Sequence, residues 1–359
     1  MELMKTEVLK INAIHPEASI IEYAAALIRR GEVVVFPTET VYGLGADAFQ
    51  PAALERIFAA KGRPFSDPLI VHIAEEDDLG RLTASIPERA RRLAQTFWPG
   101  PLTLILPRGP RVPRLVTAGL DTVAVRMPRH SVALALIRAT GSPIAAPSAN
   151  RFMHVSPTTA QHAFADLSGR VPLILDGGPS EVGVESTVLD LCAEVPRILR
   201  PGGVSLEALR SVLPGVQPPV RRAPERVSEE EAQVAPGQML IHYAPAIPLL
   251  LFDGSLEAMR NAMLDELRRR RSSGERVGVL IADEDAPVFE GIDAVIQALG
   301  SANDPQQIAT ALFAGLRALE TACVDVILCR NFDRHGLGLA IRDRLWKAAG
   351  GKVVQCEEV

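Results

Sequence analysis

The segment EVVVFPTETVYGLG covers residues 32–45 and decides how the first half of the chain is built. It opens with a β-branched run that ends at Pro37, a composition typical of a buried strand. Two hydroxyl side chains, Thr38 and Thr40, follow this strand directly. Ligand sites in α/β proteins form at strand ends and in the adjoining loops. We therefore expect a core strand that leads into a polar site.

Outward from this segment, strand-like and helix-like stretches alternate across residues 1–213. Some predicted strands follow one another with no room for a helix between them, so we expect a mixed sheet with flanking helices. We expect Ser19 to cap the first helix and Gly31 to end it. The predicted strands are 32–37, 69–73, 102–106, 122–126, 143–146, 172–175 and 187–191, and the predicted helices are 19–30, 52–60, 87–97, 132–140, 159–167 and 206–213.

The composition and residue pattern change twice in the second half of the chain. Residues 214–247 contain repeated prolines and an acidic cluster, which indicate an extended linker. Residues 248–359 then show strands at 249–252, 277–282, 294–298 and 324–329 and helices at 255–271, 305–321 and 339–349. This alternation predicts a small, Rossmann-like domain with a parallel sheet. A length of 359 residues also favours two domains.

Composition limits the function classes. The net charge of −5 gives the chain no overall attraction to nucleic acid or to an anionic membrane. We find no signal-peptide pattern and no apolar run of the roughly 20 residues that a membrane helix needs, so we expect a cytoplasmic protein. The basic run at residues 268–271 ends a predicted helix, where cations suit the helix dipole better than they indicate RNA binding.

The usual signatures of nucleotide and acyl-transfer sites are missing from the sequence. There is no phosphate-binding P-loop, no complete dinucleotide turn, no nucleophile elbow and no cluster of histidines with metal-ligand spacing. Gly43 and Gly45 read better as turn or close-packing glycines than as part of a dinucleotide site.

Four cations, however, lie at predicted strand ends or in adjoining loops: Lys61, Arg63, Arg126 and Arg200. These cations alternate with hydroxyl residues in an acidic protein, which predicts a pocket for a phosphate or a carboxylate. We expect the side chains of Lys61 and Arg63 to be partly solvated. Taken singly, each has a plainer interpretation, such as a cation that stabilises a helix end. The residues alone thus indicate an anion-binding α/β enzyme with an unknown substrate.

The same strings resemble the YrdC-like catalytic domain of threonylcarbamoyl-AMP synthases. PTETVYGLG, KGRP, PLIVH, TVAVRMP, PSAN, SPT, ESTVLD and RPG occur in the family's order between residues 19 and 212. PGQMLIHYAP at residues 236–245 resembles the linker of the two-domain form, and HGLGLAIRDRLWKAA at residues 335–349 resembles the end of its C-terminal domain. The resemblance therefore covers nearly the whole chain.

The resemblance implies an ATP-dependent nucleotidyltransferase. L-threonine, bicarbonate and ATP, with Mg²⁺, would give threonylcarbamoyl-AMP and pyrophosphate. The product would pass to a tRNA threonylcarbamoyl transferase that forms N6-threonylcarbamoyladenosine at position 37 of tRNA. The resemblance does not identify the Mg²⁺ ligands, the oligomeric state or the role of the C-terminal domain, and leaves direct tRNA binding open.

The matching positions also imply roles for individual residues. Lys61 and Arg63 are the expected catalytic pair, and Arg126 is the expected partner of the threonine carboxylate because a guanidinium can bind it bidentately. The positions expected to bind ATP are Lys61, Arg63, Thr122, Ser148, Asn150, Ser156, Arg200, His242 and Tyr243. The positions expected around threonine are Thr38, His72, Arg126 and Ser186.

Alternatives remain at this stage. Ser148 and Asn150 can form an ordinary turn, and the segment around His242 and Tyr243 can be a surface loop rather than a lid over the active site. Two other functions compete: an RNA-binding module of YrdC-like fold, and a related carbamoyl-transferring enzyme of the hydrogenase-maturation type. The chain shows no zinc-finger-like cysteines, which argues against the second.

Overall fold

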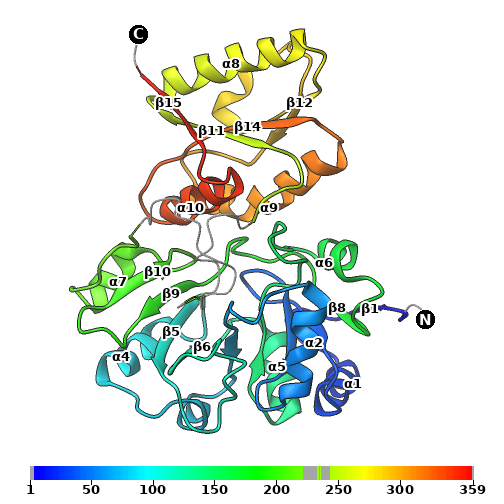
Figure 1. The fold of residues 1–359 in the computed structure, drawn as a ribbon, viewed down its shortest axis with the longest axis vertical. Helices are drawn as coiled ribbons and strands as arrows, with labels where there is room; N and C mark the ends of the chain where they lie inside the picture. Colours follow the sequence, from blue (N-terminus) through cyan, green and yellow to red (C-terminus); the bar gives the residue numbers. More distant parts are fainter. Residues whose placement is uncertain (1–3, 221–232, 234, 236–242, 358–359) are drawn as a thin grey trace. The chain divides into compact units, whose positions relative to one another are not determined.

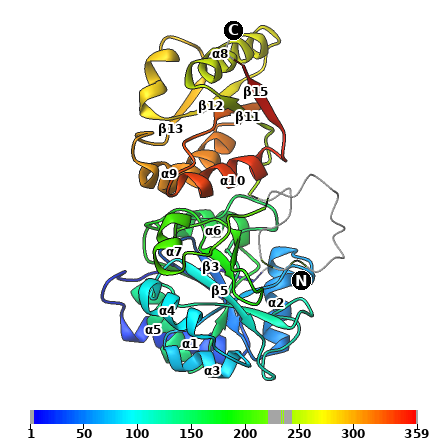
Figure 2. The same ribbon diagram turned by 90° about the vertical axis from the view of Figure 1, so that its left-hand side faces the viewer.

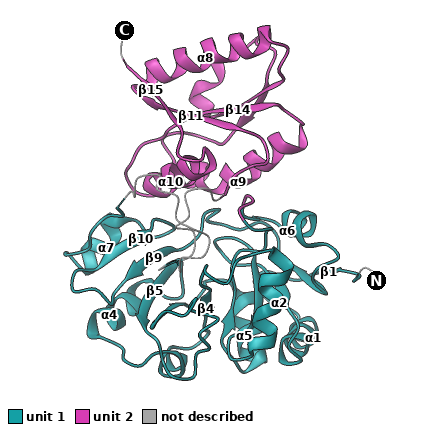
Figure 3. Cartoon of the chain, in the orientation of Figure 1, with its two compact units in different colours: residues 1–152, 156–238 teal, residues 153–155, 239–359 magenta. Residues whose placement is uncertain are grey.

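The computed structural model describes residues 4–220, 233, 235 and 243–357. The chain forms two compact units (Figure 3). Unit 1 consists of residues 1–152 and 156–238, and unit 2 of residues 239–359 together with Met153–Val155. The boundaries 1–213, 214–247 and 248–359 stay a prediction, because much of the predicted linker lies outside the described residues.

Unit 1 is built on a mixed sheet of ten strands in the order β1-β8-β2-β3-β7-β4-β6-β5-β9-β10 (Figure 1). Both parallel and antiparallel pairs occur, which confirms the mixed sheet expected from the sequence. The strands are β1 (Glu7–Lys10), β2 (Val34–Phe36), β3 (Gly43–Asp47), β4 (Ile70–His72), β5 (Leu102–Pro107), β6 (Thr122–Arg126), β7 (Ile144–Ala145), β8 (Leu173–Asp176), β9 (Thr187–Asp190) and β10 (Arg197–Arg200).

Helices cover both faces of this sheet. Along β2 and the residue before it, Val33 and Val35 join one apolar cluster while Val34 and Phe36 join another, as expected for a strand buried on both faces. The face of Val34 packs against α1 (Ala18–Arg29) and α5 (Ser131–Thr140). The other face packs against α2 (Pro51–Lys61), α4 (Glu88–Phe97), α6 (Ala160–Leu167) and α7 (Leu206–Val212), with short helices η1 (Glu76–Asp78) and α3 (Leu79–Leu82) nearby in the chain.

Unit 2 has a parallel sheet of five strands in the order β13-β12-β14-β11-β15, which confirms the Rossmann-like prediction. Figure 2 shows α8 on one side of this sheet and α9 and α10 on the other. The elements are β11 (Leu249–Gly254), α8 (Leu256–Ser272), β12 (Val277–Ile281), η2 (Asp283–Val288), β13 (Val295–Ala298), α9 (Pro305–Thr321), β14 (Val326–Arg330), α10 (Gly338–Ala348) and β15 (Val353–Cys356).

The structure corrects several local expectations. Strands β1, β3, β10 and β15 were not predicted. The N-cap of α1 is Glu17, not Ser19, although Gly31 does follow the helix with a positive φ of 85°. The basic run at residues 268–271 is confirmed as a helix end, with Arg269 and Arg270 paired to Glu266. In the described part of the chain, no helix has the length and apolarity required to span a membrane.

Candidate active site

The segment quoted at the outset builds the floor of the candidate site. Gly45 in β3 has no Cβ, and one placed there would lie 2.6 Å from Cε1 of Phe36 and 2.7 Å from Cγ2 of Ile144. The ring of Phe36 occupies this space and meets the His72 ring edge-on at 6.2 Å. Gly45 is thus a close-packing glycine, and its role is to let an aromatic ring support His72.

His72 and Arg126 stand side by side. They are register partners on the neighbouring parallel strands β4 and β6, so their side chains point to the same face of the sheet. Both are buried, with exposed fractions of 4% each. Burial, reinforced by the charge of Arg126, lowers the pKa of His72 to about 3, so His72 is neutral at physiological pH. Its Nδ1 atom has no hydrogen-bond partner among the residues that the structure describes.

Arg126 holds the PTET loop, residues 37–40, through its two Nη atoms and contacts Gly100 through Nε. Nε donates to the carbonyl of Gly100 at 3.3 Å and Nη1 to Oγ1 of Thr40 at 2.9 Å, while Nη2 lies 2.7 Å from Oε1 of Glu39. Thr38 joins this network because its Oγ1 lies 2.8 Å from that of Thr40. A guanidinium carries five N–H groups, so Arg126 keeps donors for a further carboxylate.

Lys61 and Arg63 lie at the end of α2, where Gly62 adopts a left-handed φ of 65° and turns the chain. Lys61 Nζ donates to the carbonyls of Ser148 and Asn150, both at 2.5 Å. Both cations are buried, with exposed fractions of 3% and 7%, so the expectation that they are partly solvated is wrong. The physical reason is that α2 packs against the core and its C-terminal turn faces inward rather than to solvent.

A buried carboxylate balances these cations. Asp67 is fully buried and pairs with Nη2 of Arg63 at 3.0 Å. Burial raises the pKa of Asp67, an effect that Arg63, Lys61 and Arg200 oppose through their charges. Burial, aided by Arg63, lowers the pKa of Lys61 well below its ordinary value. The structure therefore gathers three of the four cations predicted from the sequence around one acid.

Ser186 and Arg200 form a third group. Arg200 Nε and Nη2 donate to the carbonyl of Ser186 at 3.2 and 3.0 Å, and Nη2 also reaches its hydroxyl at 3.1 Å. Ser156 donates to Oε1 of Glu185 at 2.5 Å. A Cβ on Gly202 would lie 2.4 Å from the carbonyl carbon of Ser186, so the RPGG turn needs glycine to approach this backbone.

Thr122 stands apart from Arg126. Thr122 begins β6 whereas Arg126 ends it, and four residues of strand separate their Cα atoms by about 13 Å. Tyr243 is buried in unit 2, where its ring stacks on Phe313 at 5.7 Å and Arg344 lies over it at 4.8 Å. His242 lies outside the described residues. The role of Tyr243 in ATP binding stays a prediction.

One described linker residue nevertheless touches the sheet face that carries the site. Ala235 is fully buried in an apolar cluster with Ile70 and Ala124. These two are register partners, each two residues before His72 or Arg126, so all four side chains share a face of the sheet.

Sequence reasoning missed Asp67 and Glu185 and considered Glu39 only as a weak candidate for contact with Mg²⁺. Glu39, Asp67 and Glu185 are all buried, and each pairs with or accepts from a residue that the sequence did single out. The signal was present, since all three lie within the quoted strings or directly beside them. From sequence alone, an acidic residue beside a lysine or arginine is interpreted as a surface residue, because its burial is not known.

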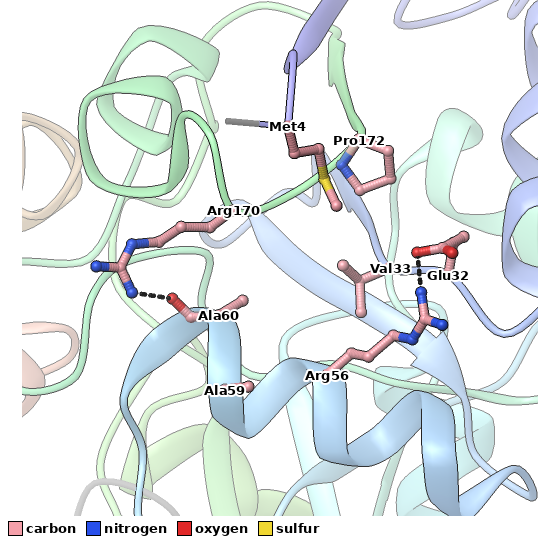
Figure 4. A pocket seen from close by; sticks show the side chains of 8 residues that line it. All are labelled: Met4, Glu32, Val33, Arg56, Ala59, Ala60, Arg170 and Pro172. Atoms are coloured by element: carbon pink, nitrogen blue, oxygen red, sulfur yellow. Dashed lines mark hydrogen bonds and ion pairs between the residues drawn. The ribbon is translucent and has the colours of Figure 1, made fainter. Parts of the chain in front are cut away.

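A cavity of about 330 Å³ lies elsewhere in unit 1, lined on one side by α2 (Figure 4). Figure 4 shows Arg56 paired with Glu32, and Arg170 donating to the carbonyl of Ala60 at 3.3 Å. None of its lining residues belongs to the candidate site. The lining residues are Met4, Glu32, Val33, Arg56, Ala59, Ala60, Arg170 and Pro172.

Chemically, the site combines two functions. One part has an arginine, a carboxylate and threonine hydroxyls, which suit a small zwitterion. The other has Lys61, Arg63 and Arg200, which suit the phosphates of a nucleotide. The buried serines of these groups contact Glu185, Thr103 and Arg200, and none of these contacts is with a histidine base. The arrangement therefore favours positioning and charge neutralisation.

Comparisons with known proteins agree with this arrangement. A family described as telomere recombination (Sua5, YciO and YrdC) matches residues 26–202, and the C-terminal domain of threonylcarbamoyl-AMP synthase matches residues 204–350. The threonylcarbamoyl-AMP synthase of Bacillus subtilis is 46% identical over 337 residues, covering 93% of this chain and 94% of the relative. That of Pyrococcus abyssi is 44% identical over 338 residues, covering 93% and 95%.

A solved structure resembles the whole chain. The crystal structure of P. abyssi Sua5 complexed with L-threonine superposes with a TM-score of 0.91 at 41% identity, covering 98% of this chain and all of the other. Sequence and fold thus agree over nearly the full length of both proteins. The chain belongs to the two-domain threonylcarbamoyl-AMP synthases, which are enzymes.

Proposed function

We propose that this chain makes threonylcarbamoyl-AMP and pyrophosphate from L-threonine, bicarbonate and ATP, and so supplies N6-threonylcarbamoyladenosine formation at position 37 of tRNA. A single observation carries the proposal. One unit of this chain, which belongs to the family, contains both a buried Arg126–Glu39 pair and the group of cations around Asp67. The P. abyssi relative was crystallised with L-threonine, which supports threonine as the amino acid here.

The threonine would bind at the face of β4 and β6. Arg126 is the proposed partner of its carboxylate, since the guanidinium keeps N–H groups beyond those that hold the PTET loop. Thr38 and His72 line the same place, and neutral His72 adds no charge to it. Ser186 is the fourth proposed contact, held in position by Arg200 and by Thr103, whose Oγ1 lies 2.7 Å away.

The ATP phosphates would bind at the second group. Lys61, Arg63 and Arg200 supply the positive charge, and Lys61 is the natural catalytic cation, together with Arg63. Lys61 also fixes the backbone at Ser148 and Asn150, two proposed ATP contacts. Ser156 and Thr122 complete the proposed set, and His242 and Tyr243 remain proposals from the linker.

The chemistry then needs no protein nucleophile. The threonine amine attacks bicarbonate and forms a carbamate with loss of water. The carbamate oxygen attacks the α-phosphorus of ATP, and pyrophosphate leaves. Lys61, Arg63 and Arg200 neutralise the charge that builds on the phosphate oxygens in that step.

Mg²⁺ would enter with ATP as part of the substrate. Among the described residues, no group of three or more His, Cys, Asp or Glu side chains is placed to hold a metal ion. Mg²⁺ bound to nucleotides takes most of its ligands from phosphates and water and few from the protein, so the residues present are compatible with this mode.

The setting follows from the reaction. An enzyme that consumes ATP and serves tRNA modification is proposed to work in the cytoplasm, and its labile product would pass to a tRNA threonylcarbamoyl transferase. A mixed anhydride needs protection from water. The proposal that residues 214–247 help to cover the site is supported by Ala235, which is buried on the face that carries His72 and Arg126.

The test is pyrophosphate release by the purified full-length chain. We expect release only when L-threonine, bicarbonate and Mg-ATP are all present, and no requirement for RNA. Serine and valine should be much poorer substrates. Equal rates with these amino acids, or rates that do not depend on bicarbonate, would contradict the assignment. A strict need for RNA would favour the RNA-binding alternative, whose affinity should also fall steeply with salt.

A further inference from the structure

The carboxylate of Glu39 is buried with one partner and spare capacity. Its side chain is 1% exposed, and its contact is the ion pair of Oε1 with Nη2 of Arg126 at 2.7 Å. Neither oxygen has a hydrogen-bond partner among the described residues. An ionised carboxylate offers about four acceptor positions, so the described residues use few of those on Glu39.

This arrangement is costly unless it serves a purpose. A buried carboxylate loses its hydration, and one ion pair replaces only part of it. Such incompletely satisfied groups in native structures call for a functional explanation. The neighbouring hydroxyls cannot serve Glu39 as they stand. Thr38 donates to the carbonyl of Val41 at 2.6 Å, and Thr40 bonds to Thr38 and Arg126.

The pair formed by Arg126 and Glu39 is the charge complement of a zwitterion. An amino acid at neutral pH carries a carboxylate and an ammonium group on the same carbon. With its carboxylate on Arg126, the ammonium group would lie beside the acceptor positions of Glu39. The recognition set would then hold no net charge, as a buried site for a neutral zwitterion requires.

We propose that Glu39 is the general base that removes the proton from threonine's ammonium group and so frees the amine to attack bicarbonate. This inference rests on the proposed function. The ammonium N–H bond breaks and an O–H bond forms on Glu39, which gives a neutral amine and a protonated carboxyl group. The amine and bicarbonate then yield the carbamate and water, with the amine's second proton leaving in that water.

The other titratable groups around Glu39 are poorer candidates. Among the described residues, Arg126 on β6 pairs with Glu39, and the charge of Glu39 acts on His130 before α5. His72 on β4 is the register partner of Arg126. An arginine stays charged. Burial holds the pKa of His72 at about 3 and lowers the pKa of His130, so neither imidazole retains a proton well at neutral pH. Glu39, in contrast, is the buried carboxylate of the pair, with acceptor positions that the described residues leave unused.

The experiment compares Glu39→Gln with the wild-type chain in threonine-dependent pyrophosphate release, across the pH range in which threonine's ammonium group titrates. Loss of a general base lowers kcat by about 10²–10⁴-fold. We expect such a loss in Glu39→Gln near neutral pH, with a smaller change in KM for threonine. Its rate should then rise about tenfold per pH unit, until threonine itself supplies the free amine. The wild-type chain should lack this rise.

Controls separate a base from a mere support for Arg126. Glu39→Asp keeps a carboxylate, so it should be slower than wild type without the alkaline rescue, and it serves also if Glu39→Gln folds poorly. Glu181→Gln alters an exposed acid near His130 and should match wild type. A pH profile of Glu39→Gln or Glu39→Asp that contradicts these patterns, or a loss confined to KM, would overturn the proposal. A wild-type chain without threonine-dependent release would instead overturn the proposed function.

Discussion

At the scale of single residues, the charged groups of the site are buried together with their counter-charges. Arg63 pairs with Asp67 and Arg126 with Glu39, and all four side chains are less than one-tenth exposed. Removing one member of such a pair strands the other and costs about 3–5 kcal/mol of stability. Substitutions here will therefore change folding and catalysis at once, and each must be measured for both.

Lys61→Ala and Arg63→Ala should lower the rate of pyrophosphate release by about two to three orders of magnitude, because each removes a cation from the transition state. Lys61→Ala should also reduce the melting temperature, since the carbonyls of Ser148 and Asn150 lose their donor. Arg56→Ala on the same helix is the matched control, with a half-exposed side chain, and should change neither quantity much. Half of the wild-type rate in either site variant would contradict the phosphate role.

The neutral state of His72 predicts how stability depends on pH. Its pKa of about 3 in the folded chain lies below its ordinary 6.5, so between these values the unfolded chain binds a proton that the folded chain does not. The stability that neutral His72 contributes to the folded chain is present above pH 6.5 and declines as the pH falls from 6.5 toward about 3. At pH 5 the loss should be about 2 kcal/mol.

Chemical denaturation of the wild-type chain and of His72→Gln, each at pH 7 and pH 5, measures this effect. The groups common to both proteins cancel, so the variant should lose about 2 kcal/mol less than wild type on acidification. The same loss in both proteins would show that His72 accepts a proton in the folded state without cost.

The sequence allowed the cations of the site to be chosen, because lysine and arginine beside short polar strings are conspicuous. It did not allow the choice of Glu39 or Asp67, whose importance depends on burial and on a partner far away in the chain. Nor did it show that Lys61 and Arg63 are buried, since a helix end can face either way. The sequence was enough to choose residues by type, but only the structure shows which of them pair with each other.

At the scale of elements, sequence pattern located most strands and missed β1, β3, β10 and β15. β6 was predicted with the bounds that the structure shows, as a run of β-branched residues flanked by polar ones. β3 was missed because Gly43 and Gly45 are poor strand formers by propensity. β10 and β15 are short and partly exposed, so neither shows a clear apolar run.

Gly45→Ala tests the reading of β3. The added Cβ would overlap Phe36 and Ile144, and overpacking of this kind costs about 1–3 kcal/mol. The displaced Phe36 ring should also disturb His72 and raise KM for threonine. Gly80→Ala is the control, because a Cβ there meets nothing within 4 Å. Unchanged stability and KM in Gly45→Ala would show that the floor of the site adapts freely.

At the scale of the whole molecule, the two units do not follow the order of the chain. Met153–Val155 belongs to unit 2 although it lies within the sequence of unit 1. His154 lies 3.2 Å from the carboxylate of Glu320, and Ala244 donates to the carbonyl of Met153 at 3.0 Å. No sequence pattern predicted that Met153–Val155 joins unit 2, because three residues are too few to show a periodicity.

Glu320→Ala should weaken unit 2. Its carboxylate accepts from the backbone of Ala246 at 2.6 Å as well as contacting His154. A lost hydrogen bond to a charged acceptor costs about 1.5–3 kcal/mol, which thermal unfolding should register as a lower melting temperature. Glu290→Ala, at an exposed position in the same unit, should leave it unchanged. If both variants melted alike, the contacts around Glu320 would contribute nothing measurable.

The exchange of Met153–Val155 has a consequence for gene architecture. A reading frame cut anywhere in the linker encodes a second piece that lacks three of its own residues, so the boundary in the gene is not the boundary in the protein. An ancestor that acquired the second unit by fusion would have had to adapt a loop of the first to complete it. Recombination that swaps the C-terminal half between relatives should therefore succeed more often when the matching tripeptide travels with it.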